Sequence, residues 1–417
     1  MSLNAERGTG NAERKRVSSA FRVPPSAFAV ALSGLAILIA TLRPTGDFVA
    51  TGWSFSLASG DKATAEVIEN LLLFIPFGAA LALRSPSPER RGGQGVRLIL
   101  AGVALSFTVE FLQQWIPGRD PSVGDLILNT TGTAAGVLLA RTAPRWLAPL
   151  PTRAAWLSLA SAAFTATVWV GTGWLLEPQL PAANALELRA PDLGSHMDLY
   201  SGHVLSVTGR LGAREPVRIV ATAGTPSGRL APILDVDDGP GPAGTIVAAD
   251  RTDLVLLIRS RSMFLDLDRP DLRARRALAG VAPGDTITIT ARTDHPGRTF
   301  CLARDARESC GLGYTIGDGW KLIFFPDHFA PWALRVLNAM WVGGGLLGVG
   351  LWGRRHAASG VALLLAVATL ALAPGLVRLN PTPLTEWLGA AGGITIGWLA
   401  SCRRNRVMFL RAPPPSL

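Results

Sequence analysis

One stretch of the chain places carboxylates, amides and a guanidinium beside long apolar runs. Residues 110–136 read EFLQQWIPGRDPSVGDLILNTTGTAAG. Two acids in this stretch, Glu110 and Asp125, suit acid/base chemistry when their environments separate their pKa values. An ionised carboxylate facing lipid is costly, so Glu110 is expected to face the interior of a helix bundle, a wet cavity or a cation. Arg119, in the connecting loop, is the nearest candidate partner.

Helical spacing gathers these polar side chains on shared faces. Glu110 and Gln113 are three residues apart, and Asp125 and Asn129 are four apart, so each pair lies on one side of its helix. Small residues continue the second face and allow a neighbouring backbone to approach closely. They are Gly132 and Gly136. A comparable stripe contains Asn70, Phe74 and Gly78, and Pro76 is expected to bend that helix.

The elements that position these residues are membrane helices. The chain has 417 residues, of which 48% are hydrophobic and 17% charged. Apolar runs of this length predict transmembrane helices. Eight spans are expected, over residues 27–42, 67–83, 98–116, 125–140, 154–175, 332–352, 359–377 and 384–401.

Helix rise places the polar groups at one depth. Glu110 lies about 9 Å from the nearer end of its span, Asn129 about 6 Å and Asn70 about 5 Å, at 1.5 Å per residue. Three spans therefore bring polar side chains to a single level, which predicts a ligand-binding cluster. Its members are Asn70, Glu110, Gln113, Arg119, Asp125 and Asn129.

Basic residues at the span ends indicate the orientation. With a cytoplasmic N-terminus, the inner segments hold 18 Lys and Arg and the short outer loops hold four. The positive-inside rule then predicts that both termini are cytoplasmic. The net charge of +10 comes from these helix ends, because residues 176–328 hold 19 acidic and 17 basic side chains. The excess suits anionic membrane lipids, and no nucleic-acid partner is expected.

A different composition between the fifth and sixth spans predicts a separate domain. Residues 178–328 contain at least seven short strand-like runs bounded by Gly, Pro and Asp, which indicate an extracytoplasmic antiparallel β-sandwich. The expected strands include HVLSVTGRL, VRIVATAG, APILDVDDG, GTIVAAD, LVLLIRS, DTITITART, TFCLAR and GWKLIFF, and RPDLRARRALAGV has a weak helical period.

Two cysteines in this domain predict a disulfide. Cys301 and Cys310 are nine residues apart in an oxidising compartment, and two buried thiols are the alternative. The acidic run DVDDGPGP offers Asp235, Asp237 and Asp238 as calcium ligands, but a solvated acidic turn fits better, because calcium takes six to eight oxygens. The five histidines lack metal-ligand spacing, so no metal or cofactor is expected.

Three blocks carry a family resemblance. NLLLFIPFG (residues 70–78), EFLQQWIPGR (110–119) and DLILNTTGTAAG (125–136) together resemble the signature of the VanZ-like family over residues 30–142. The resemblance implies a bacterial inner-membrane protein and, for the founding member, lowered sensitivity to teicoplanin. The matching positions are Asn70, Pro76, Gly78, Glu110, Gln113, Arg119, Asp125, Asn129, Gly132 and Gly136. The outer domain more loosely resembles concanavalin A-like and laminin G-like sandwiches, which would imply glycan binding.

The expected architecture is thus mixed: a polytopic α-helical bundle with an inserted all-β sandwich. Its segments are a cytoplasmic tail (1–26), a VanZ-like four-helix domain (27–142), a fifth helix (154–175), the sandwich (178–328), three C-terminal helices (332–401) and a cytoplasmic tail (402–417).

Three functions remain open for the polar cluster. In the first, it binds a lipid-linked or cell-wall precursor group, with the sandwich presenting glycan. In the second, Glu110 and Asp125 catalyse a hydrolase or transferase reaction on such a substrate. In the third, the polar residues hold the helices together and the bundle anchors the sandwich.

Overall fold

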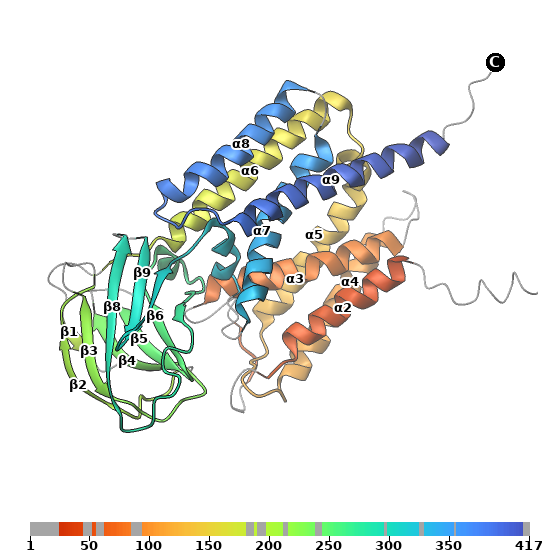
Figure 1. The fold of residues 1–417 in the computed structure, drawn as a ribbon. Helices are drawn as coiled ribbons and strands as arrows, with labels where there is room; N and C mark the ends of the chain where they lie inside the picture. Colours follow the sequence, from red (N-terminus) through yellow and green to blue (C-terminus); the bar gives the residue numbers. More distant parts are fainter. Residues whose placement is uncertain are drawn as a thin grey trace, which may run out of the picture. The chain divides into compact units, whose positions relative to one another are not determined.

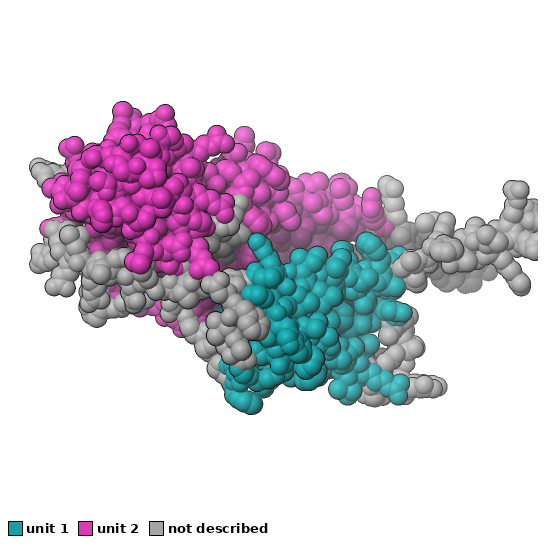
Figure 2. All heavy atoms as spheres, turned by 90° about the horizontal axis from the view of Figure 1, so that it is seen from below, with its two compact units in different colours: residues 1–59, 66–146 teal, residues 60–65, 147–417 magenta. Residues whose placement is uncertain are grey.

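The computed structural model describes residues 25–44, 52–55, 62–84, 94–180, 187–189, 197–211, 216–237, 244–295, 298–324, 329–353 and 356–411. The chain forms two compact units, coloured separately in Figure 2. Unit 1 contains residues 1–59 and 66–146, and unit 2 contains residues 60–65 and 147–417. The described secondary structure of unit 1 is helical, whereas unit 2 combines helices with two β-sheets (Figure 1).

Four helices build unit 1. They are α2 (Pro25–Thr41), α3 (Ala63–Arg84, whose first three residues belong to unit 2), α4 (Gln94–Gln113) and α5 (Val123–Leu147, whose last residue belongs to unit 2). Their core contains Ile37, Phe74, Phe77 and Val109, which are buried and packed together. Helix α3 runs through Pro76 without interruption. Because proline has no N–H, one main-chain hydrogen bond is missing at that turn.

Unit 2 contributes four further helices. They are α6 (Pro151–Leu176), α7 (Pro331–Trp352), α8 (Ala357–Leu376) and α9 (Leu384–Arg411). Helices α7 and α9 lie so close that a Cβ on Gly343 or Gly393 would overlap the main chain of the other helix. Glycine is therefore required at this crossing, as in other small-residue helix contacts of membrane proteins.

Within the described residues, six helices are long and apolar enough to cross a membrane: α3 to α8, with α4 counted from Gly95. By this composition the protein is a multi-span membrane protein. Helix α2 is shorter, at 17 residues, and α9 is not among the six; its last turns carry several arginines. The expected total of eight spans stays a prediction.

Two antiparallel five-stranded sheets lie between α6 and α7 in the sequence. One has the order β1-β4-β5-β6-β7 and the other β10-β9-β8-β3-β2. The strands are β1 (Glu187–Arg189), β2 (His203–Thr208), β3 (Val217–Thr222), β4 (Ala231–Asp237), β5 (Thr245–Asp250), β6 (Asp253–Leu257), β7 (Leu272–Ala274), β8 (Thr286–His295), β9 (Thr299–Arg304) and β10 (Arg307–Leu312). The expectation of an antiparallel β domain with at least seven strands is confirmed.

Alternation explains which side chains fill this domain. In β3, Val217, Ile219 and Ala221 are buried and Arg218 between them is exposed. This is the period of two that a half-buried strand requires. The two sheets contribute inward residues to one apolar cluster that continues into the helices of unit 2. Strand β6 is apolar on both faces, because Val255 and Leu257 join a second buried cluster on the opposite side of the sheet.

Two local expectations for this domain are wrong. The run GWKLIFF is not a strand: residues Ile316–Leu322 form the 3₁₀ helix η2. Its start is fixed by a capping box, in which Thr315 and Asp318 satisfy each other's main-chain N–H groups. The run with a weak helical period contains strand β7 instead, paired with β6 and followed by turns.

Candidate ligand-binding site

The ends of three helices and one loop form a polar cluster in unit 1. The start of α3, the end of α4 and the start of α5 each contribute side chains, and residues 114–122 connect α4 to α5. A parallel bridge between Ser54 and Ser122 holds this loop, with Ser54 N donating to Pro121 O at 2.9 Å and Val123 N to Ser54 O at 2.9 Å. This bridge fixes the loop next to the start of α5.

Glu110 is the most buried acid of the cluster, with 1% of its surface exposed. Its Oε2 accepts a hydrogen bond from the main-chain N–H of Ser122 at 2.9 Å. Ser122 also caps α5, because its Oγ accepts from Gly124 N at 3.0 Å. One serine thus fixes both the start of α5 and the position of the Glu110 carboxylate.

Two amide contacts join the helices at this level. Asn70 Nδ2 on α3 donates to Asp125 Oδ1 on α5 at 2.7 Å. Asn129 Nδ2 donates to Ser106 Oγ on α4 at 3.0 Å. The other amide oxygen, Asn129 Oδ1, is buried and has no hydrogen-bond partner among the described residues. An unsatisfied buried acceptor is costly, so this atom is a position where a bound donor would lower the energy.

Arg119 does not have the role expected for it. Its hydrogen bonds go to main-chain carbonyls at the end of α2, from Nε to Arg43 O at 3.2 Å and from Nη2 to Ala40 O at 3.1 Å. Burial lowers the pKa of the guanidinium, and the charges of four nearby acids raise it. The effect of burial is larger, so the pKa is lowered overall. These acids are, in decreasing order of effect, Glu69, Glu66, Asp125 and Glu110. Arg119 therefore stands among four carboxylates and acts on Glu110 through charge at longer range.

Gln113 joins α4 to α2 and not to the other cluster residues. Its Nε2 donates to Thr41 O at 3.1 Å, and the side chain is buried. This contact satisfies one of the free carbonyls at the C-terminal end of α2. Its expected role in ligand binding stays a prediction.

The small residues of α3 and α5 lie at a close helix crossing. A Cβ on Gly78 would overlap Thr133 O, one on Gly132 would overlap Leu71 O, and one on Gly136 would overlap Ile75 O. Close approach of these two backbones brings Asn70 within hydrogen-bonding distance of Asp125.

Four further residues contribute to this cluster and were not predicted from their types or spacing. Ser106 and Ser122 hold Asn129 and Glu110, and neither serine stands out by type in an apolar helix or a loop. Glu66 and Glu69 act on Arg119 from the first turns of α3. Glu66 could have been predicted, because it lies four residues before Asn70 and therefore on the same helix face. Glu69 is adjacent to Asn70 in the sequence and has no such spacing.

The cluster has an excess of negative charge. Four carboxylates act electrostatically on one guanidinium, and the amides of Asn70 and Asn129 with the hydroxyl of Ser106 lie among the same helices. Such a site suits a group rich in hydrogen-bond donors, such as sugar hydroxyls or an amine, and is unfavourable for a phosphate.

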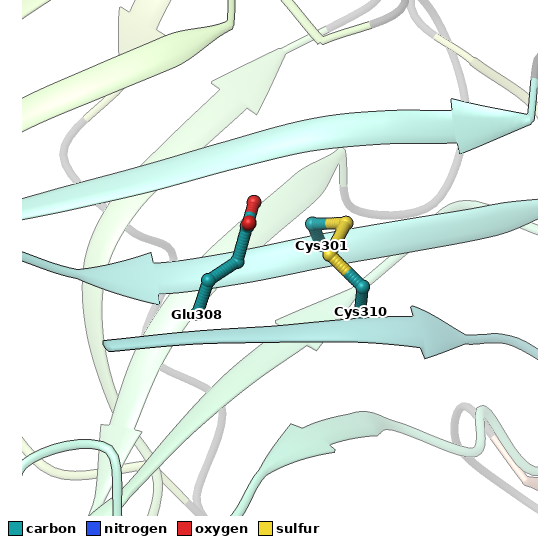
Figure 3. Close-up of side chains that lie close together, drawn as sticks. All are labelled: Cys301, Glu308 and Cys310. Carbon is teal, nitrogen blue, oxygen red and sulfur yellow. A yellow bond between two sulfur atoms is a disulfide. The ribbon is translucent and has the colours of Figure 1, made fainter. Parts of the chain in front are cut away.

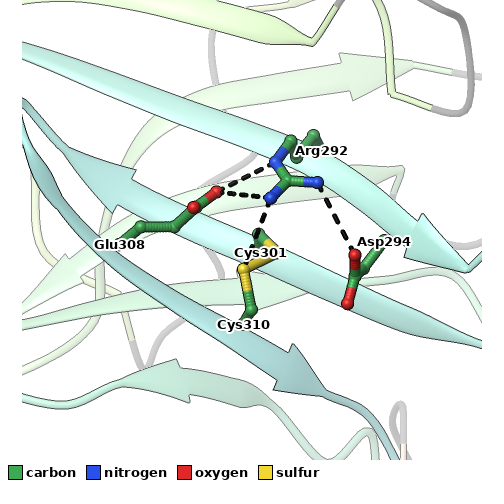
Figure 4. Close-up of a disulfide and its surroundings, with 5 residues drawn as sticks. All are labelled: Arg292, Asp294, Cys301, Glu308 and Cys310. Atoms are coloured by element: carbon green, nitrogen blue, oxygen red, sulfur yellow. Dashed lines mark hydrogen bonds and ion pairs between the residues drawn. A yellow bond between two sulfur atoms is a disulfide. The ribbon is translucent and has the colours of Figure 1, made fainter.

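The predicted cysteine pair is disulfide-bonded in the second unit. Cys301 on β9 and Cys310 on β10 are joined across neighbouring strands (Figure 3). Arg292 on β8 donates to Cys310 Sγ at 3.5 Å and to Glu308 at 2.9 Å, and Asp294 lies on its other side (Figure 4). Among the described residues, Cys301, Glu308 and Cys310 are the one group of three metal-type side chains in close proximity. Because the sulfurs are bonded to each other, they are not thiolate ligands.

The calcium candidates are only partly described. Asp235 and Asp237 lie in strand β4, and Asp235 is buried. Asp238 lies outside the described residues, as do His196 and His328. His356 accepts a hydrogen bond from Ala358 N at the start of α8, which is a capping contact.

Comparison with known proteins assigns one segment. Residues 23–144 match the VanZ/LLP1 family and include α2 to α4 with all but the last three residues of α5. No curated protein and no solved structure matches the chain. The VanZ-like resemblance is thereby confirmed for this segment, and nothing found supports the concanavalin A-like or laminin G-like resemblance of the outer domain.

Proposed function

We propose that this VanZ-family membrane protein binds the donor-rich part of a lipid-linked cell-wall precursor at the polar cluster of unit 1. The observation that carries the proposal is that four carboxylates act electrostatically on Arg119, where α3 and α5 begin and α4 ends. Ionisable groups inside membrane segments are expensive and are usually kept for function. The free acceptor Asn129 Oδ1 adds a position for a ligand hydroxyl or amine.

The proposed position of the polar cluster in the membrane follows from the basic residues at the ends of the spans. With both termini in the cytoplasm of a bacterium, the cluster lies just below the outer surface of the inner membrane, and residues 178–328 are extracytoplasmic. A lipid-linked precursor exposes its sugars and amino groups at that surface. Sequestration of such a precursor is our proposed basis for tolerance of teicoplanin-type glycopeptides.

The outer domain has a supporting role in this proposal. A glycan-binding sandwich next to the membrane would increase the local concentration of precursor. Its support is limited to the two antiparallel sheets, so a glycan array probed with the full chain provides the test. Absence of any bound glycan would leave the domain as a spacer held by the helices.

Catalysis at the same cluster is the second candidate. It is favoured by one observation: Glu110 and Asp125 come from different helices, Asp125 acts electrostatically on Glu110, and Arg119 acts on both. Two carboxylates near one substrate group could serve as acid and base. Turnover of a purified lipid-linked precursor that disappears in Asp125→Asn would select this function over binding alone. In a third possibility the cluster is purely structural and the helices anchor the sandwich.

Substitution of Glu110 separates binding from a structural role. Glu110→Gln keeps the acceptor for Ser122 N–H and removes the charge. We expect purified Glu110→Gln to keep its thermal unfolding temperature within a few degrees and to lose about tenfold or more in affinity for the lipid-linked precursor, because hydrogen bonds to a charged acceptor are about twice as strong as neutral ones.

The matched control is Glu308→Gln, which removes an exposed ion pair with Arg292 in the outer domain. It is expected to change neither quantity, since exposed pairs contribute little. Unchanged precursor affinity and unchanged teicoplanin tolerance in a folded Glu110→Gln protein would refute the binding proposal.

A further inference from the structure

A basic cavity lies in unit 2, away from the residues used above. Its volume is about 500 Å³, and it is bounded by the β5–β6 turn, by β7 with the turn after it, and by the first residues of α7. Four arginines line it: Arg251, Arg273, Arg275 and Arg276. Two acids, Asp250 and Asp253, also line the cavity, so the ionisable lining residues have a net charge of +2.

One of these arginines is already neutralised. Arg273 forms ion pairs with Asp250, with Asp271 at 2.7 Å and with Asp253 at 3.8 Å. Burial lowers the pKa of Arg273. The charges and hydrogen bonds of Asp271 and Asp250 together raise it by more, so the pKa is raised overall. Arg273 is thus a fixed part of the wall, and the two cavity acids are committed to it.

The other three arginines are exposed and available. Arg275 Nη2 donates to Phe329 O at 3.0 Å, which ties it to the chain just before α7 and uses one of its five donors. Arg276 is held by its main chain, since its N–H donates to Asp253 Oδ1 at 2.8 Å. Within the described parts of the chain, neither Arg251 nor Arg276 has a carboxylate partner for its guanidinium.

Two of these arginines have main-chain conformations that arginine seldom adopts. Arg251 has φ of 53° and Arg276 has φ of 55°, both in the left-handed region. Glycine and asparagine adopt this region more readily than arginine. Strained main-chain conformations of this kind gather at binding sites, where the surrounding structure holds them.

The cavity lies at the end of a candidate membrane span. Pro331, one of its lining residues, is the first residue of α7, which is long and apolar enough to cross the membrane. The next residue, Trp332, is 66% exposed, and tryptophan is enriched at the level of lipid headgroups. The arginines are therefore placed where the phosphates of a lipid leaflet would be.

We propose that this cavity binds the phosphate of an anionic lipid headgroup. Guanidinium groups match phosphate oxygens with two parallel hydrogen bonds, and three of them converge here without a competing carboxylate among the described residues. A free phosphate ion has the same chemistry, so the source must be separated by experiment. The inference is independent of the proposed function, because it concerns another unit and a ligand of opposite charge.

The test measures ligand binding to the purified full chain in a neutral detergent. The ligands are dioctanoyl phosphatidylglycerol, dioctanoylglycerol without phosphate, and inorganic phosphate. The double variant Arg275→Gln/Arg276→Gln removes two cavity charges. The matched control, Arg218→Gln/Arg307→Gln, removes two exposed arginines from strands β3 and β10. Arg276→Asn removes one charge at a left-handed position that asparagine tolerates, which keeps the test valid if the double variant fails to fold.

We expect phosphatidylglycerol to bind more tightly than inorganic phosphate, dioctanoylglycerol not to bind, and the double variant to lose about tenfold or more in affinity. The control is expected to change affinity by less than about twofold, and Glu110→Gln is expected to leave it unchanged. Equal binding of inorganic phosphate, with the same loss in the variant, would overturn the lipid source and assign the cavity to a soluble phosphate. Absence of binding, or binding unaffected by either cavity variant, would overturn the proposal altogether.

Discussion

At the scale of single residues, the polar side chains of this protein are engaged by main-chain groups as much as by each other. Glu110 is held by the N–H of Ser122, Arg119 by carbonyls of α2, and Gln113 by Thr41 O. Side-chain types and helical spacing predict that Asn70, Glu110 and Asn129 share a level. They do not reveal main-chain partners, because every residue carries the same N–H and C=O groups. This is why Ser122 could not be recognised from the sequence as the partner of Glu110.

In unit 2, the buried acid Asp318 is likewise held by a main-chain N–H group, together with side chains. Asp318, in η2, accepts hydrogen bonds from Thr315 N at 2.7 Å and from Asn338 Nδ2 at 2.9 Å, and it pairs with Lys321 Nζ at 2.5 Å. Burial raises the pKa of Asp318, but Lys321 and the hydrogen bonds outweigh it, so the pKa is lowered from 3.8. The ionised form is therefore the one that stabilises the fold.

The sign of the pH dependence follows from that lowered pKa. The contribution of Asp318 is complete above about pH 4 and is lost as the pH falls through its lower value in the folded state. We expect Asp318→Asn to destabilise unit 2 by about 3 kcal/mol at pH 7, because Lys321 is left without its buried partner. Thermal unfolding of the full chain at pH 7 and at pH 3 measures both effects. A variant as stable as the wild type at pH 7 would contradict this account.

At the scale of elements, strand-like runs bounded by Gly, Pro and Asp predict the longer strands well. Strands β3, β5 and β9 begin within a residue of their expected positions; β3 alternates between buried and more exposed residues, whereas β5 and β9 are buried over most of their length. Strand β10 (RESCGL) is polar and mostly exposed, and β7 has only three residues, so neither gives a pattern. The run that forms η2 is apolar enough for a strand, but the capping box before it starts a helix.

The glycine crossing of α7 and α9 gives a prediction with an adjacent control. A Cβ on Gly393 would overlap the main chain of Gly343, whereas a Cβ on Gly392 meets open space. We expect Gly393→Leu to destabilise the protein by about 1–3 kcal/mol or to prevent folding, because a side chain cannot fit between the two backbones. Gly392→Leu should be neutral. The measurement is the unfolding temperature of each purified variant; equal temperatures would show that the helices can separate at little cost.

At the scale of the whole molecule, composition predicts the general architecture but not which residues belong to the VanZ/LLP1 family segment. Long apolar runs indicate a multi-span protein, and the strand-rich region between α6 and α7 indicates an inserted β domain. The VanZ/LLP1 match ends at residue 144, so the two β-sheets and helices α6 to α9 lie outside it, and their function has to come from their own residues. In unit 2 the basic cavity supplies such residues. No local sequence motif identifies them, because its arginines come from two turns and a short strand.

The three native cysteines make the expected orientation testable without an introduced cysteine. Cys301 and Cys310 form a disulfide in the β domain, and Cys402 is a partly exposed free thiol in α9. If residues 178–328 are extracytoplasmic and the C-terminus is cytoplasmic, a membrane-impermeant maleimide should not label intact cells. After an impermeant reductant it should label Cys310, because Cys301 is buried. Cys402 should react only once the membrane is permeabilised.

The variant Cys301→Ser/Cys310→Ser, which retains Cys402 alone, is the control for this assignment. It should remain unlabelled in intact cells with or without reductant, because its one thiol lies behind the membrane. Labelling of Cys402 in intact cells would reverse the topology. The carboxylate cluster of unit 1 would then face the cytoplasm, where a precursor exposed at the outer surface could not reach it.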